Sequence, residues 1–166
     1  MRGLFLLLTL PLIVNPALAA EPSGCDKFAW RLDKERQLLS EAKPALATDA
    51  LDRDKGRAIS IDLQPWPTAK LPVPPEREPR KTPSWAGFVQ FAGASGPGRY
   101  KISLSEGAWV DIIQDAHNLK PLAFTGATDC PNIRKSVQFE LGASPFTLQV
   151  SDGPSPMIAI VITPVE

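Results

Sequence analysis

Three residues near the middle of the chain could hold a metal ion. Asp111, Asp115 and His117 form a D-x-x-x-D-x-H string at the end of an expected strand, and the two-residue period of a strand would put all three side chains on one face. Carboxylate oxygens and an imidazole nitrogen can together bind a divalent cation. The segment from Asp115 to Asn118 also has the composition of a solvated turn. We favour the turn, because three ligands at one strand end make a poor cage.

A second set of residues indicates a binding site. Trp109 and Asp111 share a face of the expected strand with Ile113, so the carboxylate lies between two large apolar side chains and is partly desolvated. Such a carboxylate requires a cationic partner, and Arg134 or Lys135 can supply it if their strand is a neighbour. We favour a structural ion pair between the strands. The alternative is an anion- or carbohydrate-recognition site that uses Trp109 as a stacking platform.

The sequence has few residues that could support other kinds of catalysis. Ser136 and Ser144 lack the full G-x-S-x-G context of a serine nucleophile, and His117 is the only histidine. Two cysteines and one histidine cannot build a zinc site of the zinc-finger type. We therefore expect no catalytic residues and no cofactor. The alternative is a metal-dependent enzyme that uses Asp111, Asp115 and His117.

The N-terminus has the pattern of a secretory leader. Arg2 precedes an apolar run over 4–14, and the small residues Ala17 and Ala19 match the positions that signal peptidase reads. We predict a signal peptide over 1–19 and a periplasmic or secreted mature protein. The apolar run is much shorter than the roughly 20 residues that a membrane-spanning helix needs. We therefore expect no membrane span.

Export would determine the oxidation state of the two cysteines. In an oxidising compartment, two lone thiols of a small domain usually pair, so we predict a Cys25–Cys130 disulfide. The alternative, two reactive thiols, has no C-x-x-C spacing and no adjacent histidine to support it.

One segment has the spacing of a helix. In residues 25–42, Phe28, Leu32 and Leu39 recur at near-helical intervals, and Ser23 is placed to cap the start. We predict one helix over this range, within an N-terminal helical segment that covers 20–57.

The rest of the chain has the pattern of strands. Short β-prone runs recur with glycine and proline turn signals between most of them and no helical pattern, which is typical of an antiparallel sandwich. We predict a mainly β protein, with a jelly-roll-like antiparallel β-sandwich domain over 58–166 and one N-terminal helix. The run 157–162 is apolar on both faces, so we place it centrally or beneath the helix. The expected strands are 58–63, 85–91, 99–104, 108–114, 121–124, 133–141, 146–150 and 157–162.

A proline-rich stretch separates the first expected strand from the others. Seven prolines fall between Pro65 and Pro83, and a stretch with so few amide donors cannot lie inside a sheet. We predict an exposed polyproline-like connector over 64–83, with the Val73 amide open to solvent exchange. The alternative is a ligand for a proline-recognising domain.

The order of residues from about Ser84 to the end is similar to that of known proteins. The motifs that carry this similarity are Gly98-Arg-Tyr100, Trp109-Val-Asp111, Cys130-Pro-Asn-Ile-Arg134-Lys-Ser-Val137 and Phe146-Thr-Leu-Gln-Val150. They resemble a family of small exported bacterial proteins of unknown function, and the β-rich part resembles the pre-peptidase C-terminal sandwich domains of secreted enzymes. Chains similar to this one sometimes carry the label homogentisate 1,2-dioxygenase. A mononuclear iron site of that kind needs about two histidines and one carboxylate, which one histidine cannot provide.

Overall charge excludes one class of partner. The 18 lysines and arginines balance 18 aspartates and glutamates, which argues against a nucleic-acid-binding protein. Together these observations predict an exported, non-catalytic binding or structural module of the bacterial cell envelope. Its expected partner is an envelope protein or a small polar ligand.

Overall fold

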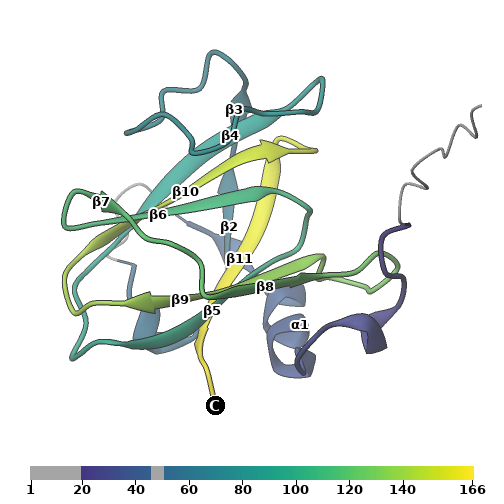
Figure 1. The fold of residues 1–166 in the computed structure, drawn as a ribbon, viewed down its shortest axis with the longest axis horizontal. Coiled ribbons are helices and arrows are strands. Elements are labelled where there is room, and N and C mark those ends of the chain that lie inside the picture. Colours follow the sequence, from purple (N-terminus) through teal and green to yellow (C-terminus); the bar gives the residue numbers. More distant parts are fainter. Residues whose placement is uncertain (1–19, 46–50) are drawn as a thin grey trace, which may run out of the picture.

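The structure is a computed structural model that describes residues 20–45 and 51–166. The predicted leader over 1–19 lies outside the described residues. Two sheets and one α-helix make up the described part (Figure 1), which confirms the prediction of a mainly β sandwich with one helix.

The larger sheet has six strands and is antiparallel except where β1 and β2 run parallel. The apolar run near the C-terminus forms β11, which lies between β2 and β5 and next to the helix, as predicted. In spatial order the strands are β1 (Lys43–Pro44), β2 (Ile59–Asp62), β11 (Met157–Pro164), β5 (Gly98–Leu104), β9 (Lys135–Leu141) and β8 (Ala123–Gly126).

The smaller sheet has five strands, and each of its pairs is antiparallel. Its central strand, β10, has a register shift between Val150 and Gly153. In spatial order the strands are β3 (Gln64–Pro65), β4 (Trp85–Phe91), β10 (Phe146–Gly153), β6 (Trp109–Gln114) and β7 (His117–Asn118).

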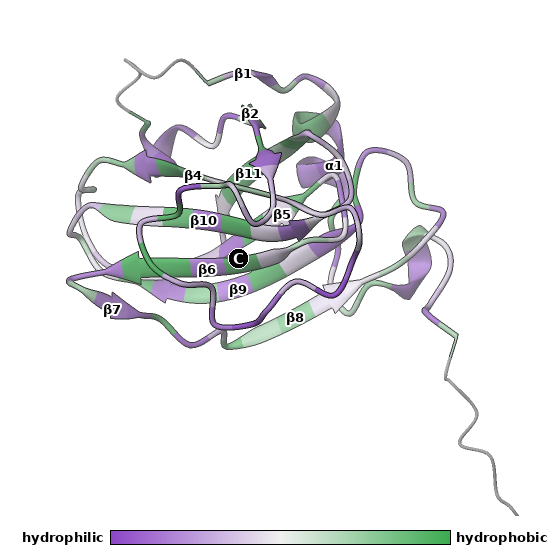
Figure 2. Cartoon of the chain, turned by 90° about the horizontal axis from the view of Figure 1, so that it is seen from above, coloured by the Kyte–Doolittle hydropathy of each residue, from purple (hydrophilic) through white to green (hydrophobic). Residues whose placement is uncertain are grey.

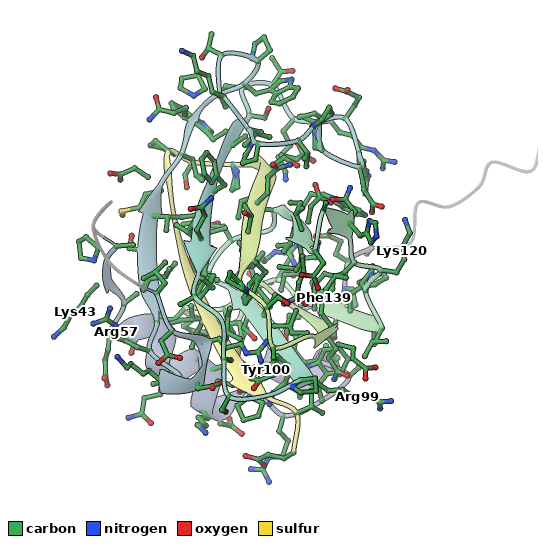
Figure 3. All side chains as sticks on the ribbon, turned by 90° about the vertical axis from the view of Figure 1, so that its left-hand side faces the viewer. Lys43, Arg57, Arg99, Tyr100, Lys120 and Phe139 are labelled. Carbon is green, nitrogen blue, oxygen red and sulfur yellow. A yellow bond between two sulfur atoms is a disulfide. The ribbon has the colours of Figure 1, made fainter. Side chains whose placement is uncertain are left out.

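Alternating apolar side chains of the two sheets meet in one core. Ile102 and Leu104 of β5 face Ile112 of β6 and Leu148 of β10 in a single buried cluster, as the two-residue period of a strand requires. Figure 3 shows Phe139 of β9 among the interior side chains, whereas Lys43 and Arg57 lie at the margin.

The helix α1 (Asp33–Ser40) is shorter than predicted. Only a short 3₁₀ turn forms at Cys25–Lys27, and the Ala29 amide donates to Thr125 Oγ1 at 2.9 Å instead of continuing a helix. Ser23 does not cap, because its hydroxyl donates to Asp129 at 2.5 Å. Tertiary bonds to the β8 region therefore replace the helical bonds that the spacing predicts. No described helix is long and apolar enough to cross a membrane.

The outer face of the six-stranded sheet is covered by α1. Leu32 and Leu39 pack with Ala58, Ile133 and Val161 in a second apolar cluster. Within this contact, Glu35 accepts a hydrogen bond from Thr163 Oγ1 at 2.5 Å and pairs with Lys101 Nζ at 2.7 Å.

The predicted Cys25–Cys130 disulfide is present. Cys130 packs against the apolar cluster beneath α1, so the bridge ties the start of the N-terminal segment to that side of the sandwich.

A second anchor follows α1 along the chain, where residues 53–55 form another 3₁₀ turn. The Arg53 guanidinium is buried, donates to the carbonyl of Gly142 at 2.7 Å and lies 4.6 Å from the ring centroid of Tyr100 (labelled in Figure 3). It holds the N-terminal segment against one end of the sandwich.

The outer face of the five-stranded sheet is covered by residues 66–84, which we name the proline strap. In Figure 1 it is the teal coil above β4, and in Figure 2 it passes in front of β10 and β6. Its amides bond to strand side chains: Glu76 N–H donates to Asp111 at 3.3 Å, and Lys81 N–H donates to Asp152 at 2.9 Å. Under the strap, Asp111, Gln149 and Ser151 form a buried polar row.

The structure corrects two details of the predicted connector. Gln64 and Pro65 are not part of it, because they form the edge strand β3. The strap is also not simply exposed: between 71 and 80, odd-numbered residues are partly buried and even-numbered residues are exposed. The Val73 amide donates a long bond, 3.5 Å, to Gln149 Oε1. In extended backbone, alternate side chains point toward the sheet, so half of them are partly buried, whereas the prediction had the connector exposed along its length.

Candidate functional site

A cleft of about 740 Å³ opens at the side of the sandwich where β6 and β8 lie at or near the sheet edges. Its walls come from the start of β6, from β8 and β9, and from the distal part of the proline strap. This volume is within the range of small-molecule sites. The apolar part of the lining is Pro22, Ala108, Trp109, Val110, Pro121, Phe124, Val137 and Pro154.

Trp109 is held in place by its own strand. Because residues two apart share a strand face, its indole Nε1–H reaches Asp111 Oδ1 at 2.7 Å. This bond uses the polar edge of the indole and fixes the orientation of the ring, which lines the cleft.

Two cations lie over the Trp109 ring. The guanidinium carbon of Arg77, from the strap, and Nζ of Lys135, from β9, are each 5.2 Å from the ring centroid. Both distances are within the range of cation–π attraction. Chain segments more than fifty residues apart therefore bring two positive charges to one aromatic side chain.

Lys135 is held at the cleft by a single described hydrogen bond, from Nζ to the carbonyl of Ala108 at 2.8 Å. Burial lowers the pKa of the Lys135 ammonium to about 8, and the neighbouring charges of Arg77 and Lys81 add to this effect. The site thus holds an ammonium that lacks full solvation and is repelled by Arg77 and Lys81, while the Asp111 carboxylate attracts it.

The remaining charges of the cleft are mostly paired. Arg134 forms an ion pair with Glu21, and Lys81 pairs with Asp152 at 3.7 Å. Glu106 also lines the cleft. Among the described residues, no carboxylate forms an ion pair with Arg77 or Lys135. Arg77 and Lys135 are therefore cations of the cleft that have no ion-pair partner among the described residues.

The predicted ion pair of Asp111 with Arg134 or Lys135 is wrong. It assumed neighbouring strands, but β6 and β9 belong to different sheets. Asp111 instead accepts hydrogen bonds from Trp109 Nε1 and from the Glu76 amide. Burial raises the pKa of the Asp111 carboxyl, and these two bonds oppose the rise. Trp109, Arg134 and Lys135 do line one cleft, and Asp111 accepts the hydrogen bond of the indole N–H.

The structure does not bring together Asp111, Asp115 and His117, the alternative set of metal ligands. Strand β6 ends at Gln114, and Asp115 and Ala116 form a tight turn with φ of 51° and 63° that reverses the chain into β7. Asp111 is buried under the strap, whereas Asp115 and His117 are exposed on the turn and on β7. The one-face argument fails because the strand does not persist. In the described parts of the chain, no three His, Cys, Asp or Glu side chains are placed to hold a metal ion.

Sequence reasoning missed Arg77 and Lys81, which the strap contributes to the cleft. The local signal was the charged run from Glu76 to Lys81 within the proline-rich stretch. A solvated connector can carry the same charges, so this run alone could not identify a site.

Searches against models of known protein families, against curated proteins and against solved structures each give no match for this chain. The resemblance to small exported proteins and to pre-peptidase C-terminal domains therefore stays a prediction.

Proposed function

We propose that this protein is an exported, non-catalytic binding module of the bacterial cell envelope, and that its cleft binds an organic anionic group. The observation that carries the proposal is the pair of cations, Arg77 and Lys135, over the Trp109 ring without a carboxylate partner among the described residues.

Electrostatics favour an anion in this position. Two like charges beside one ring repel each other, and partial burial removes some of the water that would screen them. A carboxylate or phosphate between Arg77 and Lys135 would replace that water with charge-assisted hydrogen bonds. Binding would also favour the charged ammonium of Lys135, whose pKa burial lowers.

The arrangement favours an anion over a neutral carbohydrate. A sugar would need an open face of the indole, but the two cations already lie over the Trp109 ring. The apolar lining from Pro121 and Val137 suits a ligand with a non-polar group next to its anionic group.

The disulfide supports the proposed location of the protein in the cell envelope, because a bridge of this kind persists in an oxidising compartment such as the periplasm.

Calorimetric titration with phenylphosphate tests the proposal. We expect the wild-type protein to bind, and Lys135→Met and Arg77→Met each to weaken binding by about tenfold or more, because each removes a charge-assisted contact. Lys34→Met, at an exposed position on α1, is the matched control and should change the affinity less than about twofold.

The pH profile gives a second readout. Affinity should fall as the pH rises through about 8, where Lys135 of the free protein loses its proton, and this dependence should disappear in Lys135→Met. Circular dichroism would show that each variant is folded. Absence of wild-type binding at millimolar phenylphosphate, or equal affinity of folded Lys135→Met and wild type, would refute the proposal.

A further inference from the structure

The outer edge of β8 carries backbone groups that have no sheet partner within residues 20–45 and 51–166. The Ala127 amide donates to the Arg134 carbonyl, which shows that Ala127, and by the two-residue alternation Thr125 and Ala123, face β9. Phe124, Gly126 and Thr128 must then direct their N–H and C=O groups away from β9. Figure 2 shows β8 at the margin of the strand array.

The chain itself already adds a strand to part of this edge. The Thr128 amide donates to the Pro22 carbonyl and the Gly24 amide donates to the Thr128 carbonyl, both at 2.8 Å, so that Ser23 forms a parallel bridge with Thr128. The pairing cannot extend to Gly126, because proline has no N–H to donate. Phe124 and Gly126 are left without a backbone partner on that side among the described residues.

The edge at β8 differs from the other three sheet edges. β1 and β3 each end in a proline, and β7 consists of two exposed polar residues; such features block the addition of a further strand. β8 reads Ala-Phe-Thr-Gly, with no charge and no proline. Phe124 is 73% exposed, and Leu122 beside it is 48% exposed. This edge is therefore open to an added strand.

The open edge leads into the cation cleft. Phe124 and Gly126 both line the cleft, and Gly126 lies opposite Lys135 in the β8–β9 pairing. Because Gly126 has no side chain, a residue placed beside it on an added strand has an unobstructed path toward the cations. A side chain built on Gly126 would meet the guanidinium of Arg134 at 3.6 Å.

We propose that the ligand of this cleft is an extended segment of a partner protein, which adds as a strand to β8 at Phe124 and Gly126 and directs an acidic side chain into the cleft. This proposal rests on the proposed anion-binding function. Main-chain hydrogen bonds to the two free positions would supply affinity, and the cations would select the acidic side chain. The exposed ring of Phe124 would pack against an apolar side chain of the segment.

An acetylated and amidated pentapeptide, Val-Thr-Asp-Thr-Val, tests this proposal by titration against the wild-type protein. Two N-methylated forms of the peptide are compared with it. One form lacks the N–H groups that face one edge of the extended peptide, and the other lacks those that face the opposite edge. We expect one form to bind about tenfold more weakly and the other to bind within about twofold of the parent, because one side only of an added strand faces β8. Replacing the aspartate with asparagine should weaken binding by about tenfold or more.

A variant of the protein gives an independent arm. Phe124→Pro removes an N–H that faces away from β9, so it should leave the sheet intact while abolishing peptide binding. Phe124→Ala keeps the amide and serves as the matched control, with only a moderate loss.

The outcomes separate this proposal from the proposed function. If wild-type protein binds phenylphosphate but both N-methylated peptides bind as well as the parent peptide, strand addition is wrong and anion binding stands. The same holds if a folded Phe124→Pro variant retains full peptide affinity. If neither phenylphosphate nor the peptide binds, both proposals fail.

Discussion

The outer faces of the two sheets are covered in different ways. Over the six-stranded sheet, α1 contributes an apolar cluster around Leu39 and Val161, and its one buried acid, Glu35, is fully occupied by Lys101 and Thr163. Over the five-stranded sheet, the proline strap uses its amides, which bond to side chains of the sheet such as Asp111.

The comparison shows how a covering element affects what a neighbouring surface can do. A helix satisfies its own amides, so it can cover a sheet with apolar side chains and leave little polar material for a ligand. A strap without secondary structure must find partners for its amides in the sheet below. It therefore preserves a polar row, and it brings Arg77 to Trp109 at the margin of that row. The candidate site lies on the strap-covered side of the molecule.

Breaking the ion pair under α1 should have the largest effect on stability. Lys101→Met leaves the buried Glu35 carboxylate without its cation, which typically costs about 3–5 kcal/mol. Urea denaturation would measure the loss. Burial would raise the pKa of Glu35, but the bonds from Lys101 and Thr163 bring it below the ordinary 4.5.

A folded-state pKa below the ordinary value means that the stabilisation by Glu35 is present above about pH 4.5 and is lost as the pH falls through the folded pKa. The acid-dependent loss of stability should therefore be smaller in Lys101→Met than in wild type. Equal acid sensitivity of the two proteins would contradict the role of the pair.

Removing the disulfide should have the next largest effect. Cys130→Ser frees the N-terminal segment from the helix-covered side and should cost about 2–5 kcal/mol. Thermal denaturation of the variant, compared with reduced wild type, would measure the cost. Alkylation without reductant should label no thiol in the oxidised wild type, and labelling of both cysteines would contradict the bridge.

Detaching the strap should cost less. Asp152 accepts the amides of Arg80 and Lys81 at 3.0 and 2.9 Å. Asp152→Gly tolerates the positive φ of this position, 54°, and removes the one carboxylate oxygen, Oδ1, that accepts both amides, so we expect a loss of about 1–2 kcal/mol. Hydrogen exchange of the Lys81 amide should accelerate. Asp115→Gly, at a similar φ of 51° on an exposed turn, is the matched control and should change stability little.

The buried carboxylate beneath the strap should give the smallest effect. Asp111→Asn keeps an oxygen acceptor for Trp109 Nε1 and removes a desolvated charge, so we expect the stability at neutral pH to change by less than about 1 kcal/mol. A loss as large as that of Lys101→Met would show that Asp111 has an ion-pair partner after all.

The sign of the pH effect at Asp111 is opposite to that at Glu35. The pKa of Asp111 is raised above its ordinary 3.8, so its favourable contribution is present in acid and is lost as the pH rises through the folded pKa. Stability should be measured for Asp111→Asn and wild type between pH 3 and 7. Only wild type should show this loss of stability with rising pH, because asparagine does not titrate.

The strands of the sandwich could be predicted because their patterns are local. Alternation in 99–104 placed β5 near its observed position, whereas β10 continues through Asp152 and Gly153, which the sequence predicted to be a turn. The start of α1 could not be predicted in the same way, because the Ala29 amide is taken by Thr125, almost a hundred residues away. Contacts of that kind leave no periodic trace in the sequence.

The candidate site was predicted in part for the same reason. The residue type and strand face of Asp111 correctly indicated a desolvated carboxylate, but its partners are a neighbouring indole and a strap amide rather than a cation. The partners of Asp111 depend on which sheet each strand joins. Two-residue periodicity cannot assign strands to sheets. The membership of Arg77 in the cleft depends on the path of the strap, which has no periodic pattern either.

The positions of β10 and β11 have a consequence for the timing of folding during synthesis. β10 is the central strand of one sheet, and β11 joins β2 to β5 in the other. Until residues 146–164 have left the ribosome, β10 is not available to join β4 to β6, and β11 is not available to join β2 to β5. The nascent chain must therefore expose its apolar strand faces until nearly all of the described sequence is made. A chaperone that delays aggregation over this interval would assist the protein more than one that acts on early segments.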